Sequence, residues 1–133
     1  MSIISGKSTI QRLKSKKAID LLFHEGVSLF VFPIKLIFRL EESNSSENSA
    51  GTHCGFSVPK RLHGKATTRN LLKRRLREAC RLYLTDEITS RNLLNGRRLD
   101  IMFILIDKEV TEFPILKRSM IRLRKKLIAN INS

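Results

Sequence analysis

A short strand followed by a strongly basic helix, within residues 55–83, is the feature that most constrains this chain. Residues 55–58 alternate as a strand does, Pro59 ends the strand, and Thr67 with Thr68 is typical of a helix start. At about 100° per residue, the apolar side chains that follow share one arc, which predicts packing on a sheet through Leu71, Leu72, Leu76, Ala79, Leu82 and Tyr83. The opposite arc carries Arg69, Asn70, Lys73, Arg74, Arg77 and Arg81.

This basic arc favours a polyanionic partner over a merely solvated surface. Its five cations lie within about 18 Å of helix and repel one another, and Glu78 is the one acidic residue among them. The chain has 26 Lys and Arg against 12 Asp and Glu, a net charge of +14, so nucleic acid is the first candidate partner. No apolar stretch approaches the roughly 20 residues that span a bilayer, and the amino terminus lacks the apolar segment of a secretory signal. We therefore expect a cytoplasmic protein with no membrane partner.

The pattern of the remaining segments predicts an α+β fold, a two-layer sandwich in one domain over residues 1–133. The expected order is α-β-β-β-α-β-α. The first helix begins at Ser15 and ends at Gly26 as a left-handed cap. The other expected elements are strands over 29–40, with Pro33 at an edge or bend, and over 54–58, a helix or continuation over 85–94, a central strand over 99–106 and a second basic helix over 113–128. We expect residues 1–11 to form a flexible tail and residues 41–52 a mobile hairpin loop.

Two further patterns concern surfaces that could meet a nucleic acid. Period-two alternation puts Ile34, Leu36, Phe38 and Leu40 in the core, and it leaves Lys35, Ile37 and Arg39 on the other face of the strand. A cation on each side of an apolar residue suits an RNA strand, with phosphates at the charges and a base on the apolar side chain. Ile19 and Phe23 lie four residues apart on one side of the first helix. Their spacing is equally compatible with burial and with the lining of a nucleic-acid cleft.

Residues 55–78 resemble the signature of the bacterial ribonuclease P protein subunit, a G-x-S-V-x-K-K strand end followed by R-N-R-x-K-R-x-x-R-E on a helix. The matching residues are Gly55, Ser57, Val58, Lys60 and Arg61, then Arg69, Asn70, Lys73, Arg74, Arg77 and Glu78. Leu71 stands at the third position of the R-N-R triplet, so the role of that arginine is missing here or is taken by Arg75. Residues 12–23 and Gly26 resemble the amino-terminal helix of the family, so the similarity covers most of the chain.

The resemblance implies a left-handed crossover around the signature helix and a role as the protein subunit of ribonuclease P. In that family the catalytic component is an RNA with bound Mg²⁺, which removes the 5′ leader from precursor tRNA, and the protein binds both RNAs. The protein would then be an accessory subunit of an endoribonuclease, with no catalytic residue, metal ion or cofactor of its own. By resemblance, the catalytic RNA is bound by Lys60, Arg61, Arg69, Asn70, Lys73, Arg74 and Arg77. The cleft for the leader is formed by Ile19, Phe23, Lys35, Ile37 and Ser57, of which Ile19 and Ile37 replace common aromatics.

The residues taken alone leave other functions open. No nucleophile, zinc-protease or P-loop motif is present, and Cys54 and Cys80 lack the spacing of metal ligands with His53 or His63. A ribosomal-type or chaperone-like RNA-binding protein with no part in cleavage would show the same charge. DNA binding through a recognition helix is disfavoured, because a strand and Pro59 precede the basic helix instead of a helix and a short turn. We expect no DNA partner.

Overall fold

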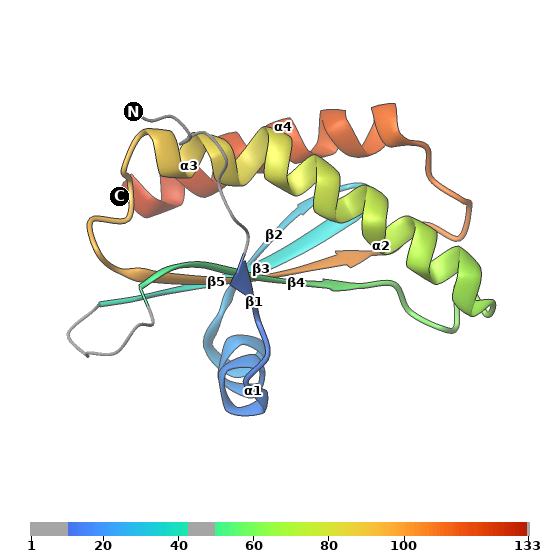
Figure 1. Cartoon of the computed structure of the whole chain (residues 1–133), viewed down its shortest axis with the longest axis horizontal. Coiled ribbons are helices and arrows are strands. Elements are labelled where there is room, and N and C mark those ends of the chain that lie inside the picture. Colours follow the sequence, from blue (N-terminus) through green and yellow to red (C-terminus); the bar gives the residue numbers. More distant parts are fainter. Residues whose placement is uncertain (1–10, 43–49, 133) are drawn as a thin grey trace.

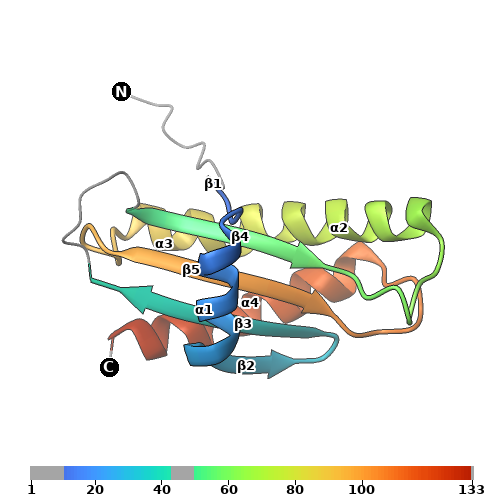
Figure 2. The ribbon, with the colours of Figure 1, turned by 90° about the horizontal axis from the view of Figure 1, so that it is seen from below.

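The computed structural model describes residues 11–42 and 50–132. Most of the predicted tail, residues 1–10, and the centre of the predicted hairpin loop, residues 43–49, lie outside the described residues. Within the described part, all strands join one sheet. Its order is β1 (Gln11–Arg12), β4 (Gly51–Ser57), β5 (Arg98–Leu105), β3 (Ile34–Glu41) and β2 (Val27–Val31) (Figure 2).

The sheet is mixed. Strands β1, β4 and β5 run parallel to one another, whereas β3 pairs antiparallel with both β5 and β2. The turn between β2 and β3 contains Phe32 and Pro33, joined by a cis peptide bond. Pro33 therefore marks a bend between two strand pieces, as its position in the sequence predicted.

The helices lie on both faces of this sheet (Figure 1). One face is covered by α2 (Ala66–Cys80), the π-helical turn η2 (Arg81–Thr85), α3 (Asp86–Ser90) and α4 (Phe113–Asn132). The helix α1 (Lys16–Glu25) crosses the other face. The α+β class and the order of the main elements are confirmed; β1 is a short addition, and α3 lies within the helix or continuation expected over 85–94.

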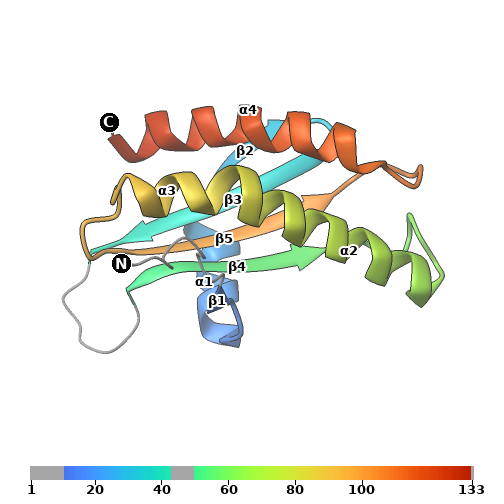
Figure 3. The same ribbon diagram turned by 45° about the horizontal axis from the view of Figure 1, so that its top comes forward.

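The crossover from β4 to β5 is left-handed. These two strands are adjacent and parallel, and the chain between them runs through α2 and α3 on the face seen in Figure 3. Viewed from the helices with both strands pointing up, β5 lies to the left of β4. Most such connections are right-handed, and periodicity carries no information about this hand.

The two faces of the sheet bury clusters of very different size. Beneath α2 and α4, side chains from every long strand and helix on that side form the main core, with Phe103 stacked on Phe56 at 5.3 Å between ring centroids. Beneath α1, the buried apolar side chains are Leu13, Leu22, Ile37 and Met102. The strand β5 lies in the centre and is buried on both faces over most of its length, as its continuous apolar run predicted.

The ends of α1 show one correct and one wrong prediction. Ser15 caps the helix, since its hydroxyl accepts a hydrogen bond from the amide of Ala18 at 3.1 Å. Gly26 is not a left-handed cap, because its φ of −76° and ψ of 163° are extended. A Cβ at Gly26 would lie 2.5 Å from the carbonyl oxygen of Leu22 and 2.7 Å from Cγ2 of Ile37. The glycine is needed because the end of α1 passes very close to β3.

The helix α2 also departs from the sequence expectation at both ends. Its N-cap is Lys65, which makes no side-chain capping bond, so Thr67 and Thr68 lie within the first turn instead of capping it. After Cys80 the π-helical turn changes the helical register. Leu82, expected in the apolar stripe, is therefore turned to the solvent, and Leu84 is buried instead.

Candidate nucleic-acid interface

The outer arc of α2 is turned to the solvent, because the apolar stripe of this helix is buried against the sheet. Asn70, Arg74 and Arg77 are exposed, and Arg69 and Lys73 are half-buried at the margins. The structure therefore brings together the helical residues that were predicted to bind the catalytic RNA. We call this surface, with Lys60 and Arg61, the docking face.

Lys60 and Arg61 lie in the turn between β4 and α2, and both side chains are exposed. Arg69 holds this turn in place, since its Nη1 donates to the carbonyl oxygens of His63 at 3.1 Å and Gly64 at 2.9 Å. A guanidinium has further donors that can contact phosphate at the same time. Arg69 thus both shapes the turn and contributes charge to it.

Two other arginines of α2 also have partners within the protein. The guanidinium of Arg77 lies over the ring of Phe56, 5.3 Å from its centroid, in a cation–π arrangement. Arg75 donates from Nη1 to the carbonyl oxygen of Thr111 at 2.6 Å and so ties α2 to the loop before α4.

The two sides of α1 face different parts of the sheet. Leu22 points into the sheet and is fully buried, while Glu25 pairs with Arg39 at 3.4 Å and so marks the side of α1 that faces this arginine. Phe23 lies about 100° around the helix from Leu22, on the side opposite Glu25. Ile19 lies one turn before Phe23 on the same side. Ile19 is half-buried, whereas Phe23 is 52% exposed, so the buried alternative does not hold for the phenylalanine.

One cross-strand row lies on the α1 face, on the side toward Phe23. In this row, Ser57 is paired with Ile104, Ile104 with Lys35, and Lys35 with Phe30. Ile104 and Ile19 pack against the same small cluster beneath α1, which places this side of the helix beside the row. Lys35 is exposed and Ser57 is half-buried.

Ile37 shares a face with Lys35 and Arg39 as its alternation predicted, but its side chain is not exposed. It is on the α1 face, but the helix covers it and leaves it 6% exposed. Lys35 and Arg39 are consequently separated by α1, and Arg39 is engaged with Glu25 and with Glu41 at 3.2 Å. The prediction of an open surface formed by these three side chains is wrong. Ile37 serves as the floor on which α1 rests.

Phe30 is a residue of this surface that sequence reasoning missed. Its ring is 51% exposed, and its register with Lys35 puts both side chains on the α1 face. The signal was present in the chain, because Phe30 lies in the strand before Pro33 at the position that a tight hairpin places opposite Lys35. We call Ile19, Phe23, Phe30, Lys35 and Ser57 the leader surface.

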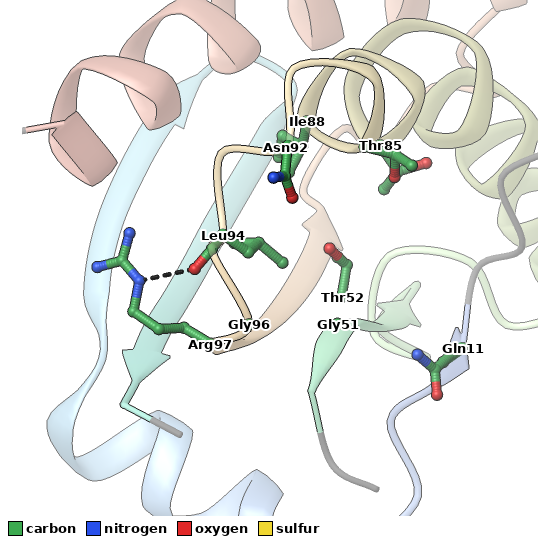
Figure 4. A pocket seen from close by; sticks show the side chains of 10 residues that line it. Gln11, Gly51, Thr52, Thr85, Ile88, Asn92, Leu94, Gly96 and Arg97 are labelled. Atoms are coloured by element: carbon green, nitrogen blue, oxygen red, sulfur yellow. Dashed lines mark hydrogen bonds between the residues drawn. The ribbon is translucent and has the colours of Figure 1, made fainter. Parts of the chain in front are cut away.

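A hollow of about 320 Å³ lies elsewhere, between the segment η2–α3, the first residues of β4 and the loop before β5 (Figure 4). Its lining is mainly neutral, with Thr52, Thr85 and Asn92 among the polar groups. Arg97 points away from the hollow, and its Nε donates to the carbonyl oxygen of Leu94 at 2.8 Å. None of the residues predicted to bind RNA lines this hollow.

The cysteines are buried in the main core. Cys54 and Cys80 are free thiols with their sulfur atoms 4.0 Å apart. Burial, and then the hydrogen bond with Cys54, raises the pKa of the Cys80 thiol. His63 lies in the turn before α2, where its Nε2 is 2.8 Å from the carbonyl oxygen of Asp107. Among the described residues, no group of three or more histidine, cysteine or carboxylate side chains could hold a metal ion.

A buried imidazole lies near the other side of α1. His53 of β4 has its Nδ1 3.9 Å from Oδ1 of Asp100, and Nε of Arg98 is 2.7 Å from the same oxygen. Burial, and then the positive charge of Arg98, lowers the pKa of His53 below 6.5, although Asp100 acts in the opposite direction. At neutral pH this side chain is therefore uncharged.

Comparison with known proteins decides what kind of protein carries these surfaces. The family model described as Ribonuclease P matches residues 8–128. The chain belongs to the ribonuclease P protein family. It is 29% identical over 131 residues to the ribonuclease P protein component of Porphyromonas gingivalis, which covers 96% of this chain and 90% of the relative.

Solved structures agree with this membership. The ribonuclease P protein from Thermotoga maritima has a TM-score of 0.63 and 26% identity, covering 87% of this chain and 96% of that one. The ribonuclease P protein of Staphylococcus aureus, at 18% identity and a TM-score of 0.59, shares the fold over 90% of this chain and 96% of that one. As a ribonuclease P protein, the chain is part of a ribonuclease and acts with an RNA subunit in the processing of tRNA 5′ leaders. In the described part of the chain, no helix is long and apolar enough to cross a membrane.

Proposed function

We propose that this ribonuclease P protein holds the 5′ leader of precursor tRNA on the leader surface while the docking face contacts the catalytic RNA. The observation that carries the proposal is the exposed ring of Phe23 on the side of α1 that faces Lys35 and Phe30. Rings stack on bases and the ammonium group meets phosphate, which is the usual combination in proteins that bind single strands. Ser57 supplies a hydroxyl next to this row.

The docking face suits a folded RNA better than a single strand. It presents Lys73, Arg74 and the turn residues Lys60 and Arg61 without an exposed aromatic ring between them. Arginine forks contact phosphate oxygens in pairs, and lysine acts as a point charge. Asn70 adds an amide that can donate to phosphate or to sugar hydroxyls.

Catalysis is assigned to the RNA subunit with its Mg²⁺ ions. Mg²⁺ is bound through oxygen ligands, chiefly carboxylates and phosphates, with several waters retained. The two proposed surfaces instead offer cations, rings, a hydroxyl and an amide, which bind RNA without holding the metal. The proposal includes a cytoplasmic location and no DNA partner, since bacterial tRNA precursors are made and processed in the cytoplasm.

Reconstitution tests this function. The full chain is combined with a bacterial ribonuclease P RNA, and cleavage of a precursor tRNA is measured at low Mg²⁺, where the RNA alone is slow. We expect the protein to restore cleavage and to bind precursor tRNA more tightly than mature tRNA. Binding of both tRNAs with equal affinity and without faster cleavage would instead identify a general RNA-binding protein.

The docking face can be tested by comparing two arginines of α2. Arg74 is exposed and makes no hydrogen bond or ion pair with the described residues, so Arg74→Ala should leave the fold intact and remove one phosphate contact. The slope of log K against log salt for the catalytic RNA should become shallower by about 0.7 to 0.9. Arg69→Ala should weaken the same binding more and also lower the thermal midpoint, because Arg69 holds the turn that carries Lys60 and Arg61.

Arg91→Ala is the matched control for both variants. Arg91 is exposed at the end of α3, and its ion pair with Glu87 lies away from the docking face. An Arg74→Ala protein that assembles and cleaves as the parent does would show that α2 is a solvated basic helix.

A further inference from the structure

A second surface with the chemistry of a single-strand site lies at the β2 edge of the molecule. Phe32, in the turn after β2, is 60% exposed, and Ile115 at the start of α4 is an exposed apolar side chain beside it. With Val31, Ser119, Arg118 and Arg122, these two side chains line a hollow of about 340 Å³. Such a volume is within the range of sites for small ligands. We call Phe32, Ile115, Arg118 and Arg122 the edge surface.

The turn that presents Phe32 is fixed to the rest of the molecule. The hydroxyl of Ser119, which is buried, donates to the carbonyl oxygen of Phe32 at 2.8 Å. The amide of Ile106 donates to the carbonyl oxygen of Pro33 at 2.9 Å. The exposed ring is therefore held in a defined place above α4 and is not part of a frayed loop.

The charge of the edge surface is not neutralised. The helix α4 carries six cations and no acid, and two of the six have partners on η2: Lys117 lies over the ring of Tyr83, and Arg124 donates to its carbonyl oxygen. Arg118 and Arg122 are on the other side of α4, exposed, and joined to no carboxylate by an ion pair in the described part of the chain. Two arginines one turn apart repel each other unless an anion lies between them.

The edge surface is separate from the docking face. The helix α2 lies over β4 and α4 over β2 and β3, so their outer sides point to opposite edges of the sheet (Figures 2 and 3). The strands β4 and β2 are three strand spacings apart, roughly 14 Å. The docking face and the edge surface therefore lie on different helices at different edges of the sheet.

From these observations we infer that the edge surface binds a single-stranded segment of RNA, with a base stacked on Phe32 and its phosphates on Arg118 and Arg122. An exposed ring beside two unpaired guanidinium groups is the pairing of stacking and charge that such segments require. A second copy of the chain fits less well, because two copies meeting at this edge would bring four arginines together on chains of +14 each. The inference goes beyond the proposed function and does not depend on it.

Photo-crosslinking of the full chain tests this site. A ten-nucleotide RNA carrying 5-iodouridine, which reacts with aromatic rings on which it stacks, is titrated against the protein, and the modified residues are located by mass spectrometry. We expect a crosslink at Phe32. In the double variant R118Q/R122Q, the concentration that gives half-maximal crosslinking at Phe32 should rise about ten-fold, and the salt slope at this site should become shallower by about 1.4.

The matched control is R91Q/K108Q, which removes the same charge at two exposed positions that do not line the edge surface and should leave the Phe32 midpoint unchanged. An equal shift in both double variants would overturn the inference, because general charge would then explain the binding. So would a parent protein without a crosslink at Phe32. Sedimentation without RNA measures the oligomeric state of the protein. A dimer in which Phe32 is buried would overturn the inference and assign the edge surface to a second copy of the chain. Failure of precursor-tRNA cleavage on reconstitution would affect only the proposed function.

Discussion

On one face of the sheet, α2 and α4 lie side by side and bury a continuous cluster in which Leu76, Phe103 and Leu123 are fully inaccessible. On the other face, α1 alone crosses the strands and buries a cluster of four side chains. The rows of strand residues on each side of α1 are left partly open, with Lys35 on one side and Arg39 on the other.

The difference shows how one sheet separates stability from binding. Each fully buried leucine of the main core contributes roughly 1.5–3 kcal/mol, so the α2 and α4 face supplies most of the folding energy. Because that energy is available there, the α1 face can leave Phe23 and Phe30 exposed for a ligand. The closely approaching Gly26 and the buried Leu22 hold α1 in position with few contacts.

Replacing one leucine on each face should give the largest effect. Leu76→Ala leaves a cavity enclosed by the main core and should lower the free energy of unfolding by about 4 kcal/mol. Leu22→Ala should cost about 2–3 kcal/mol, since α1 can settle toward the sheet and fill part of the space. Urea unfolding followed by circular dichroism measures both.

The variant that loses less stability should lose more of the binding preference. Under conditions where both are folded, Leu22→Ala should lose the preference for precursor over mature tRNA, because α1 positions Phe23. Leu76→Ala should keep this preference. Equal losses of stability and of preference in the two variants would remove the distinction between the faces.

The aromatic rings of the leader surface give the next effect. Phe23→Ala and Phe30→Ala should each weaken precursor tRNA binding by about 1–3 kcal/mol if a base stacks on each ring, and mature tRNA binding should change little. Both rings are about half exposed, so neither substitution should unfold the protein. Val110→Ala, at an apolar side chain of similar exposure in the loop before α4, is the control. An equal loss of affinity for both tRNAs would show that the rings support the fold and do not contact the leader.

Much of this comparison could be predicted from the sequence. The α2 stripe at Leu72, Leu76 and Ala79, the apolar run of β5 and the Ser15 cap are local patterns, and each appears in the structure where its pattern indicated. The crossing of α1 over Ile37 could not be predicted, because alternation within β3 gives a face but not the helix that covers it. The exposure of Leu82 has a similar origin, since a single π-helical turn changes the register that a constant 100° per residue assumes.

The sequence could predict only some of the residues that form the proposed site. The signature residues of α2 were found from their resemblance to a family, and the structure places them on one face. Phe30 and Phe32 resemble no part of that signature. The hairpin register with Lys35 could have placed Phe30, whereas the position of Phe32 depends on the Ser119 hydroxyl of a distant helix. Contacts between residues so far apart in sequence leave no local pattern.

The smallest expected effect concerns the buried imidazole and carboxylate of the sheet, His53 and Asp100, which both point to the α1 face. The pKa of His53 in the folded protein is below 6.5, the ordinary value that applies to the unfolded chain, mainly because of burial and then because of Arg98.

Above about pH 7.5 the imidazole of His53 is neutral in both states and contributes no pH dependence. As the pH falls through 6.5, the unfolded chain takes up a proton that the folded protein does not, so the free energy of unfolding decreases. The slope cannot exceed about 1.4 kcal/mol per pH unit for one proton, and we expect the free energy of unfolding to decrease between pH 7.5 and 5.5. Urea unfolding at several pH values measures the slope of the free energy of unfolding against pH in the parent and in His53→Gln. The difference between the two slopes isolates the contribution of His53 from that of other groups, whatever the absolute stability of the variant. A parent slope equal to that of His53→Gln would show that His53 takes up its proton in the folded state, and the α1 face would then tolerate a buried charge as well as an open surface.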